Sequence, residues 1–132
     1  MNIECRTPTV DEYLEIRKTT NWWDVNRSAT EDALKASIFS AVAVENETVI
    51  EFGRIVGNGG LYFYIQDLIV RPEYQNKGIG KSLMSELMAF IKDNAKQGAF
   101  VGLMAAQGVA KYYEAFGFKV RDATASGMFQ VI

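Results

Sequence analysis

The feature that most constrains this chain is a glycine-rich turn at residues 71–83, which reads Arg-Pro-Glu-Tyr-Gln-Asn-Lys-Gly-Ile-Gly-Lys-Ser-Leu. An apolar, strand-like run precedes the turn and a long amphipathic pattern follows it, so the chain passes here from a strand into a helix. Free backbone N–H groups, the positive end of the helix dipole and the side chains of Lys77 and Lys81 would all face one small volume. The turn therefore predicts a site for phosphate.

The turn differs from the two common nucleotide-binding motifs that also place glycines before a helix. Residues 80–82, Gly-Lys-Ser, match the end of a P-loop, but that motif needs glycine where this chain has Gln75. A dinucleotide fingerprint that starts at Gly78 needs a small residue at the position of Leu83. Neither motif is complete, and what remains is a Gln-x-x-Gly-x-Gly turn that opens a helix directly after a strand.

The chain is long enough for one hydrophobic core and shows no sign of a second domain. It has 132 residues, of which 48% are hydrophobic, including eight Phe, six Tyr and two Trp. We find no repeat, low-complexity tract or proline-rich linker. Residues 1–132 are therefore expected to form a single domain.

Charge and residue usage argue against several functional classes. The formal net charge is −2 and the isoelectric point is near 5.2, so no nucleic-acid partner is expected. Because no apolar stretch has membrane-spanning length and the N-terminus does not resemble a signal, we expect no membrane segment and a cytoplasmic location. The chain has no histidine and Cys5 is its single cysteine, so we expect no metal site, no internal disulfide and no histidine base.

Segments with helical and strand-like periodicity alternate along the chain. Thr9 and Glu12 have the spacing of a capping box, which predicts the start of the first helix. The expected order is βααβββαβαββ, an α+β fold with an antiparallel meander before the glycine turn. The first expected elements are a strand at 2–6, the first helix, a second helix at 30–38 and strands at 39–44, 48–56 and 61–70. After the glycine turn we expect its helix, a strand at 100–105, a helix at 109–116 and closing strands at 118–120 and 128–132.

Two stretches of the chain resemble the GNAT acyltransferase superfamily. Residues 64–80, Tyr-Ile-Gln-Asp-Leu-Ile-Val-Arg-Pro-Glu-Tyr-Gln-Asn-Lys-Gly-Ile-Gly, are similar to its fourth strand and pyrophosphate loop. Residues 111–118, Lys-Tyr-Tyr-Glu-Ala-Phe-Gly-Phe, are similar to its late helix. A third, shorter stretch, Gly-Met-Phe at residues 127–129, resembles a narrower group, the small bacterial and plant amine acetyltransferases. Since the element order also matches, the resemblance implies a mixed, mostly antiparallel sheet whose fourth and fifth strands splay apart.

The resemblance implies that acetyl-CoA is the co-substrate. The pantetheine arm of CoA would bond to the exposed backbone of the fourth strand, as an added strand would. In this chain that backbone belongs to Leu68, Ile69 and Val70. The pyrophosphate would lie on the N–H groups of the glycine turn. The residues expected to hold it are Gln75, Asn76, Lys77, Gly78, Ile79, Gly80 and Lys81.

Acetyl transfer from a thioester needs an oxyanion donor and a proton for the departing thiolate. The resemblance assigns the first role to a backbone N–H at the splayed end of the fourth strand, that of Ile69 or Val70. It assigns the second to Tyr113, whose phenol has a pKa that suits proton donation to a thiolate held beside it. Tyr112 is then expected to be a packed neighbour on the same helix.

The amine must also lose a proton, and here the chain departs from its relatives. Polyamine acetyltransferases carry a glutamate at the position of Gln66, and glutamine cannot accept a proton. Asp67 is the adjacent candidate for a base or for a residue that holds water. On a regular strand Asp67 would face away from Gln66, whereas a bulge would change this. A second departure is Ala106, where many relatives have an asparagine that contacts CoA.

The expected acceptor pocket and the expected assembly depend on fewer residues. Trp22, Trp23, Phe52 and Arg54 lie where relatives wall the acceptor pocket, and they could stack on an aromatic or cationic amine; ordinary core or lid packing is the alternative. Residues 128–132 form an apolar edge with which a second copy could pair, so a homodimer is one expected assembly.

The sequence therefore predicts an acetyl-CoA-dependent N-acetyltransferase that acts on a primary amine, with a small amine favoured. One alternative is an enzyme that acetylates a protein lysine or N-terminus. Another is a CoA-binding module without turnover, for which the glutamine at position 66 is the supporting feature.

Overall fold

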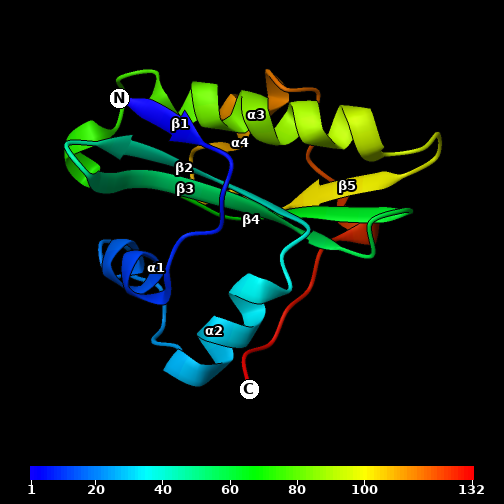
Figure 1. The fold of residues 1–132 in the computed structure, drawn as a ribbon. Coiled ribbons are helices and arrows are strands. Elements are labelled where there is room, and N and C mark those ends of the chain that lie inside the picture. The colour runs from blue at the N-terminus through cyan, green and yellow to red at the C-terminus, as the bar shows by residue number, and fades with distance from the viewer.

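A computed structural model describes residues 1–132 and has one central sheet with helices on both faces (Figure 1). Its five strands lie in the order β1-β2-β3-β4-β5. Helices α3 and α4 cover one face, and α1 and α2 cover the other. The strands are β1 (Asn2–Glu4), β2 (Phe39–Glu45), β3 (Thr48–Gly57), β4 (Tyr62–Val70) and β5 (Phe100–Leu103). The helices are α1 (Val10–Arg17), α2 (Arg27–Lys35), α3 (Ile79–Asn94) and α4 (Ala110–Glu114), with short 3-10 turns η1 (Pro72–Tyr74) and η2 (Ala123–Ala125).

The sheet is antiparallel except at one edge. β1, β2, β3 and β4 pair with their neighbours in antiparallel register, whereas β4 and β5 are parallel. This confirms the predicted mixed, mostly antiparallel sheet. The parallel pairing ends where Ile65 meets Leu103, although β4 continues to Val70. Residues 66–70 therefore have no strand on their β5 side.

Each face of the sheet has its own hydrophobic core. On the α3 face, Leu83 and Leu87 are fully buried against residues that include Phe63. These two leucines are four residues apart and so project from one side of the helix. On the opposite face, Ile16 of α1 and Phe52 of β3 are fully buried together. The two cores fix α3 above the sheet and the pair α1 and α2 below it.

The helices on the lower face begin at side-chain caps. Thr9 and Glu12 form the predicted capping box at the start of α1. The second helix was expected to start near residue 30, but it begins at Arg27 because the side chain of Asn26 accepts a hydrogen bond from the Ala29 N–H group. No helix combines the length and the hydrophobicity of a membrane span.

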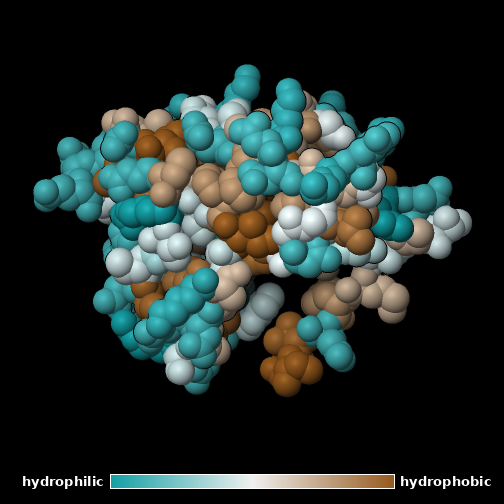
Figure 2. All heavy atoms as spheres, turned by 45° about the vertical axis from the view of Figure 1, so that its right-hand side comes forward, coloured by the Kyte–Doolittle hydropathy of each residue, from teal (hydrophilic) through white to brown (hydrophobic).

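The prediction of two closing strands is wrong. Residues 118–120 and 128–132 pair with no strand, so β5 is an edge of the sheet and the order βααβββαβαββ loses its last two strands. The chain after Phe118 leaves the sheet through the η2 turn and runs toward the side of α1 and α2 (Figure 1). Its last residues stand away from the body of the protein (Figure 2), with Met128 89% and Phe129 79% exposed. Strand-like composition favours an extended chain there, but a strand also needs a partner edge.

Candidate active site

The glycine turn leaves the first turn of α3 open. Gly78 is the N-cap residue of the helix and has a φ of 78°, a left-handed conformation that glycine adopts at little cost. No side chain caps the helix, so the N–H groups of its first turn have no side-chain partner. A Cβ atom at Gly78 would meet nothing within 4 Å, so the backbone conformation and not a lack of space calls for glycine. Such an end can hold an anion.

The other residues predicted to hold pyrophosphate lie on the same turn. Gln75 Nε2 donates a hydrogen bond of 3.2 Å to a carbonyl at the end of β4, which ties the turn to that strand. Lys77 Nζ lies 5.6 Å from the centre of the Tyr74 ring, and Lys81 is exposed. Ile79 differs because its side chain is buried in the upper core, so that only its backbone can face a ligand.

The unpaired half of β4 leads directly into this turn. Leu68 packs toward the α3 core, while Ile69 is buried in the opposite core. Val70 ends the strand one residue before the turn begins. The three residues predicted to meet the pantetheine arm therefore form a continuous backbone edge from the middle of the sheet to the N-terminus of α3.

A buried glutamate lies beneath the turn, and the sequence analysis did not single it out. Glu51 of β3 has no exposed surface, and neither of its carboxyl oxygens has a hydrogen-bond partner. Its Oε1 lies 3.5 Å from the point where a Cβ of Gly80 would be, and Tyr112 Oη lies 3.3 Å from the same point. Burial raises the pKa of Glu51 to about 8. The sequence feature that could have identified Glu51 is the presence of an acidic residue inside the apolar run at 48–56.

The two tyrosines of α4 differ in where they lie. Tyr112 Oη reaches the first turn of α3, where it is buried and has no hydrogen-bond partner. Tyr113, the predicted acid, packs edge-on against Phe118 and lines a groove of about 820 Å³ beside β5 and α4. Burial, with Glu51 nearby, raises the pKa of both phenols, that of Tyr112 to about 12. Both therefore hold their protons at neutral pH, and the hydroxyl group against the glycine turn is that of Tyr112.

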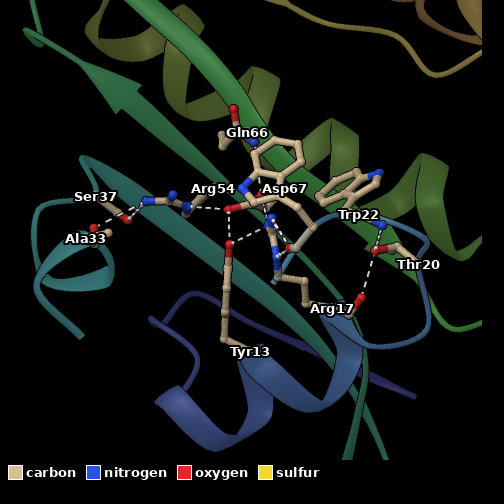
Figure 3. Close-up of polar contacts among 10 residues, drawn as sticks. Tyr13, Arg17, Thr20, Trp22, Ala33, Ser37, Arg54, Gln66 and Asp67 are labelled. Carbon is tan, nitrogen blue, oxygen red and sulfur yellow. Dashed lines mark hydrogen bonds and ion pairs between the residues drawn. The ribbon is translucent and has the colours of Figure 1, made fainter. Parts of the chain in front are cut away.

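On the opposite face of the sheet, Asp67 is the centre of a buried polar network (Figure 3). Its carboxylate accepts hydrogen bonds from Tyr13 Oη at 2.9 Å, Arg54 Nε at 2.8 Å and Gln66 Nε2 at 2.9 Å. Arg17 Nη1 lies 3.6 Å from the same carboxylate. Three of the four lone-pair positions of a carboxylate are thus used by protein donors. This occupancy favours an anchoring role for Asp67 over one as a free base.

A bulge in β4 creates this arrangement. Between the pairs Arg54–Gln66 and Phe52–Ile69, β4 has one more residue than β3. Asp67 has a φ of 59°, which is uncommon for a residue other than glycine. The regular alternation of side chains is broken here, and Gln66 and Asp67 both face α1 and α2. The bulge is the alternative that the sequence left open.

A cavity of about 250 Å³ lies between this network and the two lower helices. Of the four predicted acceptor residues, Arg54 and Trp23 line it. Trp22 lies beside it, with its ring centre 5.2 Å from the Arg17 guanidinium carbon. Phe52 does not line the cavity, because it is fully buried with its ring 5.1 Å from that of Tyr13.

Two residues of the network were missed by the sequence analysis. Tyr13 and Arg17 are one helical turn apart on α1, and both are buried. Arg17 Nη1 donates to Tyr13 Oη at 3.2 Å, and Arg17 Nη2 donates to the Trp23 carbonyl at 3.1 Å. The sequence feature that could have identified them is an arginine four residues after an inward-facing tyrosine, on the apolar side of a helix.

Comparisons with known proteins agree with the fold. A family model described as an acetyltransferase (GNAT) domain matches residues 36–120. A probable acetyltransferase of unknown function from meticillin-resistant Staphylococcus aureus is 27% identical, with 99% of this chain and 98% of that chain covered and a TM-score of 0.93. A GNAT-family acetyltransferase from Streptococcus pneumoniae is also 27% identical, with 99% and 97% covered and a TM-score of 0.83.

More distant structures share the fold alone. Glucosamine-6-phosphate N-acetyltransferase from Arabidopsis thaliana is 16% identical, with 98% of this chain and 100% of that chain covered and a TM-score of 0.69. A search of curated proteins finds no significant match.

The buried glutamate predicts an unusual dependence of stability on pH. The folded protein keeps a proton on Glu51 up to a pKa of about 8, whereas the unfolded chain releases it near 4.5. Because the folded state binds more protons between these values, its free energy of unfolding should fall as pH rises through this window, by at most roughly 5 kcal/mol. The Glu51→Gln variant should lose this part of the decline.

Thermal unfolding followed by circular dichroism from pH 5 to pH 9 measures the effect. Glu86→Gln is the matched control, because Glu86 is exposed on α3. Equal slopes of Tm against pH in the wild type and Glu51→Gln would contradict the assignment of the proton to Glu51.

Proposed function

The chain belongs to the GNAT acetyltransferase family, and from this membership we propose that it is an acetyl-CoA-dependent N-acetyltransferase acting on a small primary amine. The observation that carries the proposal is the succession of three features along the chain. Gln66 and Asp67 line the cavity, the unpaired residues 66–70 of β4 follow, and the uncapped N-terminus of α3 comes after the next turn. Such an arrangement can hold a small acceptor, an extended arm and a diphosphate in that order.

In the proposed complex, backbone groups bind most of the co-substrate. The N–H groups between Gln75 and Lys81 hold the pyrophosphate, and Lys77 adds positive charge. The free edge formed by Leu68, Ile69 and Val70 bonds to the pantetheine arm as an added strand would. This places the thioester near the bulge, above the cavity.

The proposed reaction is direct attack of the amine on the thioester. The amine nitrogen bonds to the acetyl carbon, and the N–H group of Ile69 or Val70 stabilises the negative oxygen of the tetrahedral intermediate. The carbon–sulfur bond then breaks, and the sulfur takes a proton from Tyr113 Oη, which solvent restores. The amine nitrogen loses its proton to water near Asp67. The three hydrogen bonds of Asp67 favour holding this water, and holding Gln66, over accepting the proton itself.

The size of the cavity favours a small acceptor over a protein. A volume of about 250 Å³, lined in part by residues of α1 and α2, is below the usual range for ligand sites of about 300–1,000 Å³. An extended peptide would need an open groove along the network. Acetylation of a protein lysine or N-terminus is therefore the second candidate. A CoA-binding module without turnover is the third.

We also propose that two copies of the chain associate through β5 and the segment at 128–132. The outer edge of β5 is unpaired and flanks the groove of about 820 Å³. Ser126 and Gly127 line one end of this groove, and the exposed apolar residues begin directly after them. In a dimer, the exposed edge of β5 in one copy can pair with the exposed apolar segment of the other copy.

Substitutions at two glycines test the co-substrate site. Gly78→Glu should weaken CoA binding at least tenfold, because it places a carboxylate at the anion-binding end of α3. Gly59→Glu is the matched control, since Gly59 also has a left-handed φ, 77°, and also has no neighbour within 4 Å of a Cβ atom. Isothermal titration calorimetry with CoA measures both. Equal affinity for CoA in the two variants would refute the site.

Substitutions at two tyrosines test the acid. Tyr113→Phe should lower kcat by roughly 100-fold with little change in the KM for acetyl-CoA, because a general acid contributes about 10²–10⁴ in rate. Tyr112→Phe should have the smaller effect. The release of CoA thiol with a panel of small amines measures both. A larger loss in Tyr112→Phe would move the role to the phenol at the glycine turn, and tight CoA binding without turnover of any amine would favour the binding module.

Removal of residues 128–132 tests the dimer. The shortened chain should elute as a monomer in size-exclusion chromatography with light scattering, while its melting temperature at low concentration stays unchanged, because these residues contact little within one copy. A full-length chain that is monomeric at all concentrations would contradict the proposal.

A further inference from the structure

We infer that the acceptor carries an anionic group, a carboxylate or a phosphate, in addition to its amine, and that Arg17 and Arg54 bind this group. The inference rests on the proposed function in that it takes the cavity at Asp67 as the acceptor site. It goes further because it names the chemical class of the acceptor.

The charges around the cavity do not balance. Arg17 and Arg54 both line it, and Asp67 is the only acidic residue that does. All three side chains are largely buried, at 8%, 12% and 1% exposure. Buried charge without a partner is costly, so a cavity with one excess guanidinium favours an anion. A polyamine or another purely cationic acceptor would add positive charge to a site that already has too much.

The hydrogen bonds of Arg54, which lines the cavity, leave one of its nitrogens without a partner. Arg54 uses Nε for Asp67 and Nη1 for the Ala33 carbonyl and Ser37 Oγ, while Nη2 has no hydrogen bond (Figure 3). A guanidinium group has five N–H donors, and a carboxylate or a phosphate can accept two of them side by side. The free Nη2 group thus has the chemistry of an anion receptor.

Arg17 lies 3.6 Å from the Asp67 carboxylate, which it shares with Arg54, and its closer contacts are with neutral groups. Its Nε and Nη2 donate to the Trp23 carbonyl, and its guanidinium carbon lies 5.2 Å and 5.1 Å from the ring centres of Trp22 and Trp23. The two indole rings therefore already bind a cation, which leaves them less available to stack on a cationic amine. Aromatic rings and a carbonyl orient Arg17, and the single Asp67 carboxylate cannot neutralise both arginines.

The position of the polar groups sets the orientation of the acceptor. Gln66 lies at the start of the unpaired half of β4, and its Nε2 donates to Asp67, which leaves its carbonyl oxygen without a hydrogen bond. That oxygen can accept a hydrogen bond from the amine. The anionic group would then lie toward Arg54 and the amine toward the thioester. The cavity of about 250 Å³ has room for an acceptor of the size of an amino acid.

The two tryptophans provide a binding readout that does not require turnover. They are the only tryptophans in the chain, and both lie against Arg17. Tryptophan fluorescence of the full chain, saturated with CoA, should be titrated with matched non-aromatic amines. The carboxylate pair is leucine and leucine amide, the phosphate pair is glucosamine 6-phosphate and glucosamine, and spermidine is the cationic reference.

In at least one pair, the member that carries the carboxylate or phosphate should bind at least tenfold more tightly than the partner that lacks it, and spermidine should bind most weakly. Whichever pair shows the preference identifies the anion as carboxylate or phosphate. Arg54→Gln should abolish the preference, while Arg54→Lys should retain part of it. Arg27→Gln is the control, because Arg27 is an exposed arginine on α2 outside the cavity.

Two outcomes would overturn the inference: equal or weaker binding of both anionic members, or an unchanged preference in a folded Arg54→Gln variant. The rate of CoA release with the same amines is measured in parallel. Preferential binding of anionic amines without any acetyl transfer would support the acceptor class but contradict the proposed function. Transfer to neutral amines alone would support the function and contradict the class.

Discussion

The buried carboxylate of Asp67 is the interaction on which the lower half of the molecule depends. It accepts hydrogen bonds from α1 through Tyr13 and from β3 through Arg54, and Arg54 in turn donates to a carbonyl of α2. A buried charge is stable in a protein only when such partners surround it. The two helices and the sheet are therefore joined by polar contacts as well as by apolar packing. The same ion pairs and hydrogen bonds hold the side chains that line the cavity between them. Without Asp67, two arginines would remain buried with no acidic partner.

The two faces of the sheet differ in how their buried ionisable side chains are satisfied. Below the sheet the carboxylate of Asp67 has protein donors around it, whereas above the sheet Glu51 and the hydroxyl of Tyr112 have none. A satisfied network holds a framework in one arrangement, while unsatisfied buried groups are rare and tend to mark functional sites. The upper pair lies directly under the glycine turn, at Gly80. The lower network therefore serves as the rigid part of the site, and the upper pair lies where a ligand is expected to approach.

Much of the fold could be predicted because its signals are local. The i, i+4 spacing of Leu83 and Leu87 identified α3, and Thr9 identified the start of α1. The closing strands at 118–120 and 128–132 failed because a strand needs an edge to pair with, which no local pattern reveals. The glycine turn could be singled out because its residues are adjacent in sequence, whereas Trp23 and Arg54 were assigned to the acceptor pocket only through the family resemblance. Tyr13 and Asp67 are 54 positions apart, and their contact depends on a bulge that adds one residue to β4.

That bulge also bears on how the free protein avoids association with itself. Residues 66–70 of β4 present unpaired backbone groups, and a flat open edge of this kind is a template on which strands of other chains can add. The left-handed conformation of Asp67 breaks the regular spacing of those groups at the start of the open stretch. A second polypeptide strand, whose donors and acceptors repeat at fixed intervals, would have to accommodate this irregularity, as β3 does on the other side of β4. A narrow, flexible ligand with a few amide groups has no fixed repeat to match. The bulge that directs Asp67 toward its partners therefore also disfavours the addition of a regular strand along this edge.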